Sequence, residues 1–228
     1  MKNKLTSNIL LAFAIVLIII TSIIFKSPWM ALSSGVLGLL TIFFQAKGCI
    51  AGQIIGVLDS LSYGIFAFTF GYYGEFIVYV IILVPIFIYG VFSWAKNSQN
   101  AHIMPKKIFP LEWILVGIFV VLFGTIFYFF LKFIDCKSLY LNLISMISLT
   151  LANYLIARRS FWGFVFLIIN DIVLILLWGI VIIQGDIRTI NFLLCAVIYL
   201  INDICGLICW TKDYKLLLSK TSTSDSTP

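Results

Sequence analysis

Acidic and amide side chains within apolar stretches of the chain are the residues best placed to do chemistry. Five of them are singled out inside such stretches, namely Asp59, Asn170, Asp171, Asn202 and Asp203, and Asn153 lies near the end of another stretch. Burying these groups in hydrocarbon is costly, so they face a bundle interior or a cavity, or they bond a neighbouring helix. They are candidates for binding the hydroxyl or amide groups of a solute, and helix-to-helix bonding is the alternative.

Aromatic residues follow these polar groups at helical spacing. Three stripes show it: Asp59 with Tyr63, Asp171 with Trp178, and Asn202 with Trp210. Residues four, seven or eight apart lie on one face of a helix. Each stripe therefore joins hydrogen-bonding groups to a flat ring, which suits a solute with a heteroaromatic ring and hydroxyl groups. Trp94 and Trp210 end their stretches, so marking the lipid headgroup level is an equal alternative for them.

The composition indicates that lipid surrounds these stretches. The chain has 228 residues, of which 62% are hydrophobic and 11% charged. Soluble domains average roughly 45–50% apolar and about 25% charged residues. The apolar runs are long and do not alternate, so they predict transmembrane helices rather than barrel strands. The net charge of +6 comes without a dense basic stretch, so we expect no nucleic acid partner.

Hydropathy predicts eight membrane spans in an all-α protein, and the positive charges predict its orientation. Eleven of the fifteen Lys and Arg residues fall on one side, so a multi-pass cell-membrane protein with both termini cytoplasmic is expected. The predicted segments are an N-terminal anchor helix (1–27), a first three-helix repeat (28–96), a polar loop and linker helix (97–135), a second three-helix repeat (136–212) and a disordered cytoplasmic tail (213–228). The spans themselves are 8–25, 28–46, 50–70, 74–95, 111–133, 138–156, 161–183 and 188–210.

An internal repeat relates the two triplets. Ala46-Lys47 aligns with Ala157-Arg158 at an offset of 111, and Trp94-Ala95-Lys96 aligns with Trp210-Thr211-Lys212 at an offset of 116. One helix separates the triplets, so both have the same orientation in the membrane. This is a parallel repeat with a pseudo-twofold axis along the membrane normal, and a solute site is expected at the interface of its halves.

Several segments resemble the PnuC-type vitamin transporters. AKGCIAGQIIGVLDSLSYGIFAFTFGYYGEF and VPIFIYGVFSW resemble the first half of that family, and ANYLIARRSFWGFVFLIINDIVLILLW and LINDICGLICW the second. The resemblance covers about residues 28–212. It implies a fold similar to the SWEET sugar carriers and a site that includes, by position, Asn153, Trp162, Asp171, Trp178, Asn202 and Trp210.

The resemblance also implies an activity. Members of this type carry nicotinamide riboside by facilitated diffusion without ion coupling, and an intracellular kinase traps the vitamin; homotrimers are expected. Relatives take thiamine, riboflavin or deoxynucleosides, which stay open as substrates. A substrate-binding subunit of an ATP-driven importer is a further alternative.

Other function classes find little support in the sequence. There is no phosphate-binding loop of the form G-x-x-x-x-G-K-[ST]. The five cysteines form no CxxC pair, so neither a metal site nor a cofactor is expected. No set of paired catalytic residues is evident, which favours a carrier over a membrane-embedded enzyme.

Overall fold

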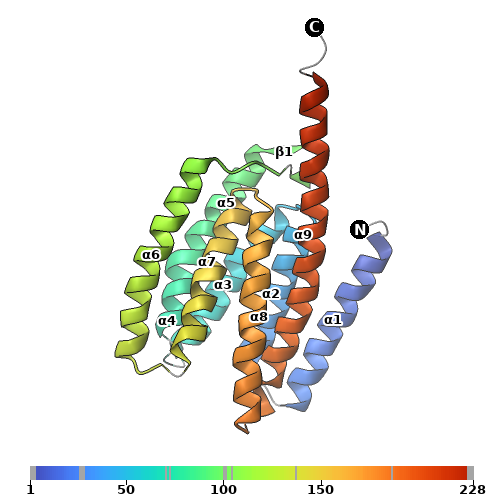
Figure 1. Cartoon of the computed structure of the whole chain (residues 1–228). Helices are drawn as coiled ribbons and strands as arrows, with labels where there is room; N and C mark the ends of the chain where they lie inside the picture. The colour runs from blue at the N-terminus through green and yellow to red at the C-terminus, as the bar shows by residue number, and fades with distance from the viewer. Residues whose placement is uncertain are drawn as a thin grey trace.

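The computed structural model describes residues 4–25, 29–69, 71, 73–99, 102–103, 105–136, 138–185 and 187–224. Within these residues the chain folds into a bundle of eight long helical stretches (Figure 1). Six of them are long and apolar enough to cross a membrane, and α1 and α2 add shorter apolar stretches. The elements are α1 (Lys4–Ile24), α2 (Trp29–Ala46), α3 (Ala51–Thr69), α4 (Tyr73–Phe76), η1 (Ile77–Leu83), α5 (Val84–Lys96), β1 (Ser98–Gln99), β2 (His102–Ile103), α6 (Pro110–Phe133), α7 (Leu139–Ala157), α8 (Trp162–Ile183), η2 (Ile187–Thr189) and α9 (Ile190–Ser224). The eight-helix, all-α prediction is therefore confirmed.

The fourth span differs from the others because it contains a π-helical turn. α4, η1 and α5 follow one another without a break, and together they form one span of 24 residues, most of them apolar. Pro85, at the start of α5, has no N–H to donate to the preceding turn. The Val84 amide instead bonds the carbonyl of Tyr79, five residues back. The wider π turn therefore lies immediately before the proline.

The helices pack as two equivalent triplets. α2 packs on α3 as α7 packs on α8, and α3 packs on α5 as α8 packs on α9. Between the triplets, α2 contacts α9 and α5 contacts α7. If the two triplets are exchanged, the α2–α9 contact becomes the α7–α5 contact, as expected for a pseudo-twofold axis between them. α6 packs mainly on α7 at the edge of the bundle, and α1 lies against α2 and α9 (Figure 1).

The predicted offset of 111 recurs in individual hydrogen bonds. Gly48 N–H donates to the carbonyl of Gln45 at 2.9 Å, and Arg159 N–H donates to that of Ile156 at 2.8 Å. Both turn residues adopt the left-handed conformation, with φ of 63° at Gly48 and 65° at Arg159. Equivalent backbone geometry at equivalent positions confirms the internal repeat.

The connection between α5 and α6 touches both of these turns. The Ile103 amide donates to the carbonyl of Gly48 at 3.2 Å, and the Lys106 amide donates to that of Arg159 at 2.8 Å. The Ile103 side chain is buried beside Trp94 and Trp210. This segment therefore ties the equivalent ends of the two triplets together.

The extra helix α1 attaches to the second triplet through polar side chains. The Thr21 hydroxyl donates to the amide oxygen of Asn191, and the Asn191 amide donates to the Ser22 hydroxyl. All three side chains are buried. Because hydrocarbon offers these groups no other partner, they fix the end of α1 against the start of α9.

The C-terminal tail corrects one expectation. Disorder was predicted from residue 213, but α9 continues to Ser224. Residues 211–224 contain no glycine or proline, so nothing in their backbone stops the helix. The Tyr214 ring also packs on Phe161, with centroids 5.4 Å apart. The other predicted domain boundaries stay a prediction.

Candidate functional site

Two carboxylates meet between α8 and α9. The side chains of Asp171 and Asp203 lie close enough to interact with each other, and they are 2% and 1% exposed. The Asn202 amide donates to Asp203 Oδ1 at 3.3 Å. One oxygen of each carboxylate, Oδ2, has no hydrogen-bond partner. Buried polar atoms rarely stay unpaired in a protein interior, so these oxygens are available acceptors.

Tyr199 brings a carboxylate of the first triplet to the same place. It lies one turn before Asp203 on α9, and its hydroxyl donates to the carbonyl of Gly35 at 2.9 Å. A Cβ atom at Gly38 would lie 2.7 Å from that hydroxyl and 3.5 Å from Asp59 Oδ2. Only glycine at position 38 therefore lets α9 approach α2 closely enough for Tyr199 and Asp59 to meet.

Electrostatic interactions at Tyr199 join groups from both triplets. Asp59 and Tyr79 of the first triplet and Asp171 of the second act on its hydroxyl. We call these four residues together with Asp203 the Tyr199 cluster. Sequence reasoning missed Tyr199 and Tyr79. The four-residue spacing from Tyr199 to Asp203 was a usable signal for the first, whereas Tyr79 lies in a π-helical segment that the sequence analysis did not predict.

A second polar group extends this cluster along α3. The Tyr63 hydroxyl donates to Glu75, and the Tyr63 and Tyr79 rings are 4.3 Å apart between centroids. Glu75 was not among the predicted residues. It lies near the start of its span, where an acid can be read simply as a helix-end residue.

Two tryptophans close one end of the interface between the triplets. The Trp94 indole N–H donates to the Ile156 carbonyl of α7 at 3.0 Å, and the Trp210 indole N–H donates to the Gln45 carbonyl of α2 at 3.2 Å. Each bond crosses from one triplet to the other. The two rings contact each other with centroids 5.7 Å apart and are fully buried. This position excludes the membrane-interface role that was the alternative for both residues.

Glycines allow the third helix of each triplet to approach the second. A Cβ at Gly90 would lie 2.1 Å from Gln53 Oε1, and a Cβ at Gly206 would lie 2.5 Å from Cε1 of Phe164. These contacts are equivalent under the repeat. The amide groups of Gln45 and Gln53 are buried without a hydrogen-bond partner, so two unpaired amides lie near the tryptophan pair.

Other predicted site residues lie apart from this cluster. The Asn153 amide donates to the Leu149 carbonyl of its own helix at 2.9 Å, and Asn170 accepts a bond of 2.7 Å from the Ser145 hydroxyl of α7. The Trp178 ring stacks on Phe192 at 4.5 Å. Helix-to-helix bonding, the alternative considered from the sequence, thus accounts for Asn170.

The environment of Trp162 differs most from that of a substrate-binding residue. Its side chain is 41% exposed at the start of α8. It stacks on Phe161 and meets the edge of Trp113, with centroids 5.4 and 5.6 Å apart. This exposed aromatic group is typical of a tryptophan at the membrane interface.

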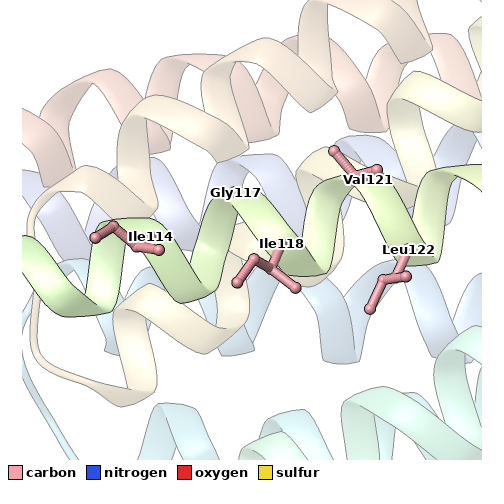
Figure 2. A pocket seen from close by; sticks show the side chains of 5 residues that line it. All are labelled: Ile114, Gly117, Ile118, Val121 and Leu122. Atoms are coloured by element: carbon pink, nitrogen blue, oxygen red, sulfur yellow. The ribbon is translucent and has the colours of Figure 1, made fainter.

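Two cavities lie on either side of α6, and none of the predicted site residues lines them. The first is a shallow apolar hollow on the outer face of that helix (Figure 2), lined by Ile114, Gly117, Ile118, Val121 and Leu122. The second lies between α5, α6 and α7. Asp171 and Asp203 are almost fully buried, so a solute needs a movement of the triplets to reach them.

The polar groups at this interface are suited to binding a solute by hydrogen bonds. Hydroxyl, carboxylate and amide groups from both triplets meet inside a membrane-spanning bundle. No group of three His, Cys, Asp or Glu side chains among the described residues is arranged to hold a metal ion. Two like-facing triplets with a polar cluster at their interface define a membrane transporter with a parallel repeat.

Comparison with known proteins identifies the family. A model described as nicotinamide mononucleotide transporter matches residues 28–212, and the chain belongs to that family of membrane transporters. Two relatives are named nicotinamide riboside transporter PnuC. The one from Neisseria mucosa is 25% identical over 190 residues, covering 81% of this chain and 72% of the relative. The one from Haemophilus influenzae is 24% identical over 188 residues, covering 81% and 80%.

A solved structure supports the fold. The chain resembles the crystal structure of the vitamin B3 transporter PnuC with a TM-score of 0.76 and 23% identity, over 92% of each chain. The family membership confirms the predictions of a PnuC-type, multi-pass membrane transporter that is not an enzyme.

Proposed function

We propose that this chain carries nicotinamide riboside across the cell membrane. The observation that carries the proposal is the family match over residues 28–212, supported by two relatives that bear the name of this substrate. The Tyr199 cluster suits the ligand chemically, because a riboside offers hydroxyl groups to carboxylates and amides. Its cationic pyridinium ring is favoured by nearby carboxylates and aromatic faces.

Transport proceeds by alternating access in this proposal. The two triplets rock about their interface and expose the Tyr199 cluster to one side of the membrane and then to the other. Both termini lie in the cytoplasm, the protein forms a homotrimer, and an intracellular kinase traps the vitamin by phosphorylation. Thiamine, riboflavin or a deoxynucleoside is the alternative substrate, and a binding subunit of an ATP-driven importer is the alternative role.

Uptake by the purified full-length protein in liposomes tests the substrate. We expect labelled nicotinamide riboside to enter without any other protein, and excess unlabelled nicotinamide riboside to compete better than thiamine, riboflavin or deoxynucleosides. Asn202→Ala should weaken solute binding at least about fivefold, because a hydrogen bond is worth roughly 1 kcal/mol. Trp178→Ala should have a similar effect, because in this proposal the movement of the triplets frees the Trp178 ring from Phe192 to stack on the solute. Asn142→Ala, near the start of α7, is the matched control.

The outcomes separate the candidates. Unchanged affinity in both variants removes Asn202 and Trp178 from the site. Tight binding with no uptake supports the role as a binding subunit of an importer. Stronger competition by another vitamin identifies that vitamin, and not nicotinamide riboside, as the substrate.

Ion coupling is tested in the same liposomes. We expect the initial uptake rate to stay the same when proton and sodium gradients are collapsed, because facilitated diffusion draws only on the gradient of the solute. The measurement compares the initial rates in liposomes that hold an imposed proton or sodium gradient with the rates after an ionophore has dissipated that gradient. A rate that falls at least threefold on collapse of the proton gradient would assign a relay role to the carboxylates of the Tyr199 cluster and contradict uncoupled transport.

A further inference from the structure

The second cavity beside α6 has an apolar wall. It has a volume of about 220 Å³, smaller than the roughly 300–1,000 Å³ of typical small-molecule sites. Two of its lining residues carry hydroxyl groups, and that of Thr150 already donates to the Met146 carbonyl at 2.8 Å. An apolar chain fits such a wall better than a polar solute does. The lining residues are Ile82, Ile86, Leu115, Val116, Phe119, Thr150, Leu151 and Tyr154.

One end of this cavity leads to a group of cations. Arg158 follows Tyr154 by one helical turn, about 6 Å along the axis of α7. Its guanidinium pairs with Glu112 at the start of α6 and donates to the Tyr89 hydroxyl at 3.0 Å. These contacts join the middle of α5 to the start of α6 and the end of α7, towards the end of the bundle where α9 finishes (Figure 1).

Positive charge exceeds negative charge at this end. The carboxylate of Glu112 is already paired with Arg158. Three further cations, Lys106, Lys107 and Arg159, form no ion pair within the described part of the chain. The Lys106 amide bonds the Arg159 carbonyl, and its ammonium lies 5.3 Å from the ring of Phe109, next to the start of α6. Burial lowers the pKa of Arg159, and the charge of Arg158 lowers it further. A bound anion next to Arg159 would stabilise its charged form against both the burial and the repulsion by Arg158.

We infer that the cavity between α5, α6 and α7 and the cations at its end form a binding site for one anionic phospholipid. The acyl chain lies against Leu115, Phe119 and Leu151, and the phosphate lies near Lys106, Lys107 and Arg159. An apolar cavity with basic residues at its entrance is the arrangement expected where a membrane protein binds the anionic headgroup of a lipid. The site is separate from the Tyr199 cluster, so its occupation does not depend on which solute is carried.

Lipid binding to the full-length protein in detergent tests the inference. The probe is fluorescent phosphatidylglycerol, with fluorescent phosphatidylcholine for comparison. The double variant Lys106→Gln with Lys107→Gln should weaken phosphatidylglycerol binding about fivefold for each cation removed and leave phosphatidylcholine binding unchanged. The matched control is Lys212→Gln with Lys215→Gln, which removes two exposed cations of α9. It should leave both affinities unchanged.

A second variant tests the acyl chain. Leu115→Trp places a large side chain in the cavity, and we expect it to weaken phosphatidylglycerol binding at least fivefold. Leu122→Trp, on the outer face of α6 (Figure 2), should have no effect. Equal affinity of the wild-type chain for the two lipids overturns the inference, as does an equal loss in the control variants. Displacement of the lipid by glycerol 3-phosphate at similar concentration would show a plain phosphate site and would also overturn it.

Discussion

Gly206→Leu is expected to reduce solute uptake to less than about a tenth of the wild-type rate while the protein still inserts into the membrane. A Cβ atom at this position would lie 2.5 and 2.8 Å from two carbons of the Phe164 ring. Overpacking of this kind costs roughly 1–3 kcal/mol and shifts the backbone. The shift would move α9 away from α8 one turn from Asn202 and Asp203, and so separate the carboxylate pair.

Uptake into liposomes measures this effect, and size-exclusion chromatography confirms that the variant is folded. Gly179→Leu is the matched control, because nothing lies within 4 Å of a Cβ at that position of α8. A Gly206→Leu protein that keeps more than half of the wild-type rate would show that close packing of α9 on α8 is not needed for transport.

Trp94→Ala and Trp210→Ala are expected to destabilise the protein by similar amounts, each by about 3–5 kcal/mol. Each change removes a fully buried ring and a hydrogen bond that crosses between the triplets. Because the rings contact each other, the double variant should lose less than the sum of the single losses. Chemical unfolding in mixed micelles measures the three values.

Trp29→Ala serves as the control for tryptophan removal. Its side chain is 72% exposed, so the expected change is within about 0.5 kcal/mol. A loss at Trp94 that is several times larger than the loss at Trp210 would contradict the equivalence of the two positions.

The sequence predicts the helices of this protein better than their contacts. Long apolar runs broken by short polar turns place seven of the eight spans to within a few residues, because lipid allows only such runs to cross, whereas the last helix continues well past its predicted end. The offset of 111 identifies Gly48 and Arg159 as equivalent before any contact is known. Both results depend on local properties of the chain.

The composition of the site depends on tertiary packing instead. Tyr199 of α9 meets α2 at Gly35 and Gly38, residues far from it in the sequence. Tyr79 lies in the π-helical part of its span, where ordinary helical spacing does not apply. The family resemblance placed Trp162 among the site residues, although the fold leaves it at the exposed start of α8.

Geometric equivalence of the two triplets does not extend to their energies. Gly48 and Arg159 share one left-handed backbone conformation, which glycine adopts freely and which costs a residue with a side chain roughly 1–2 kcal/mol. The second triplet therefore carries conformational strain at its first turn that its counterpart lacks. A rearrangement that lets Arg159 return to negative φ would release this energy on one side of the pseudo-twofold axis alone, so the two halves need not respond equally to the same displacement.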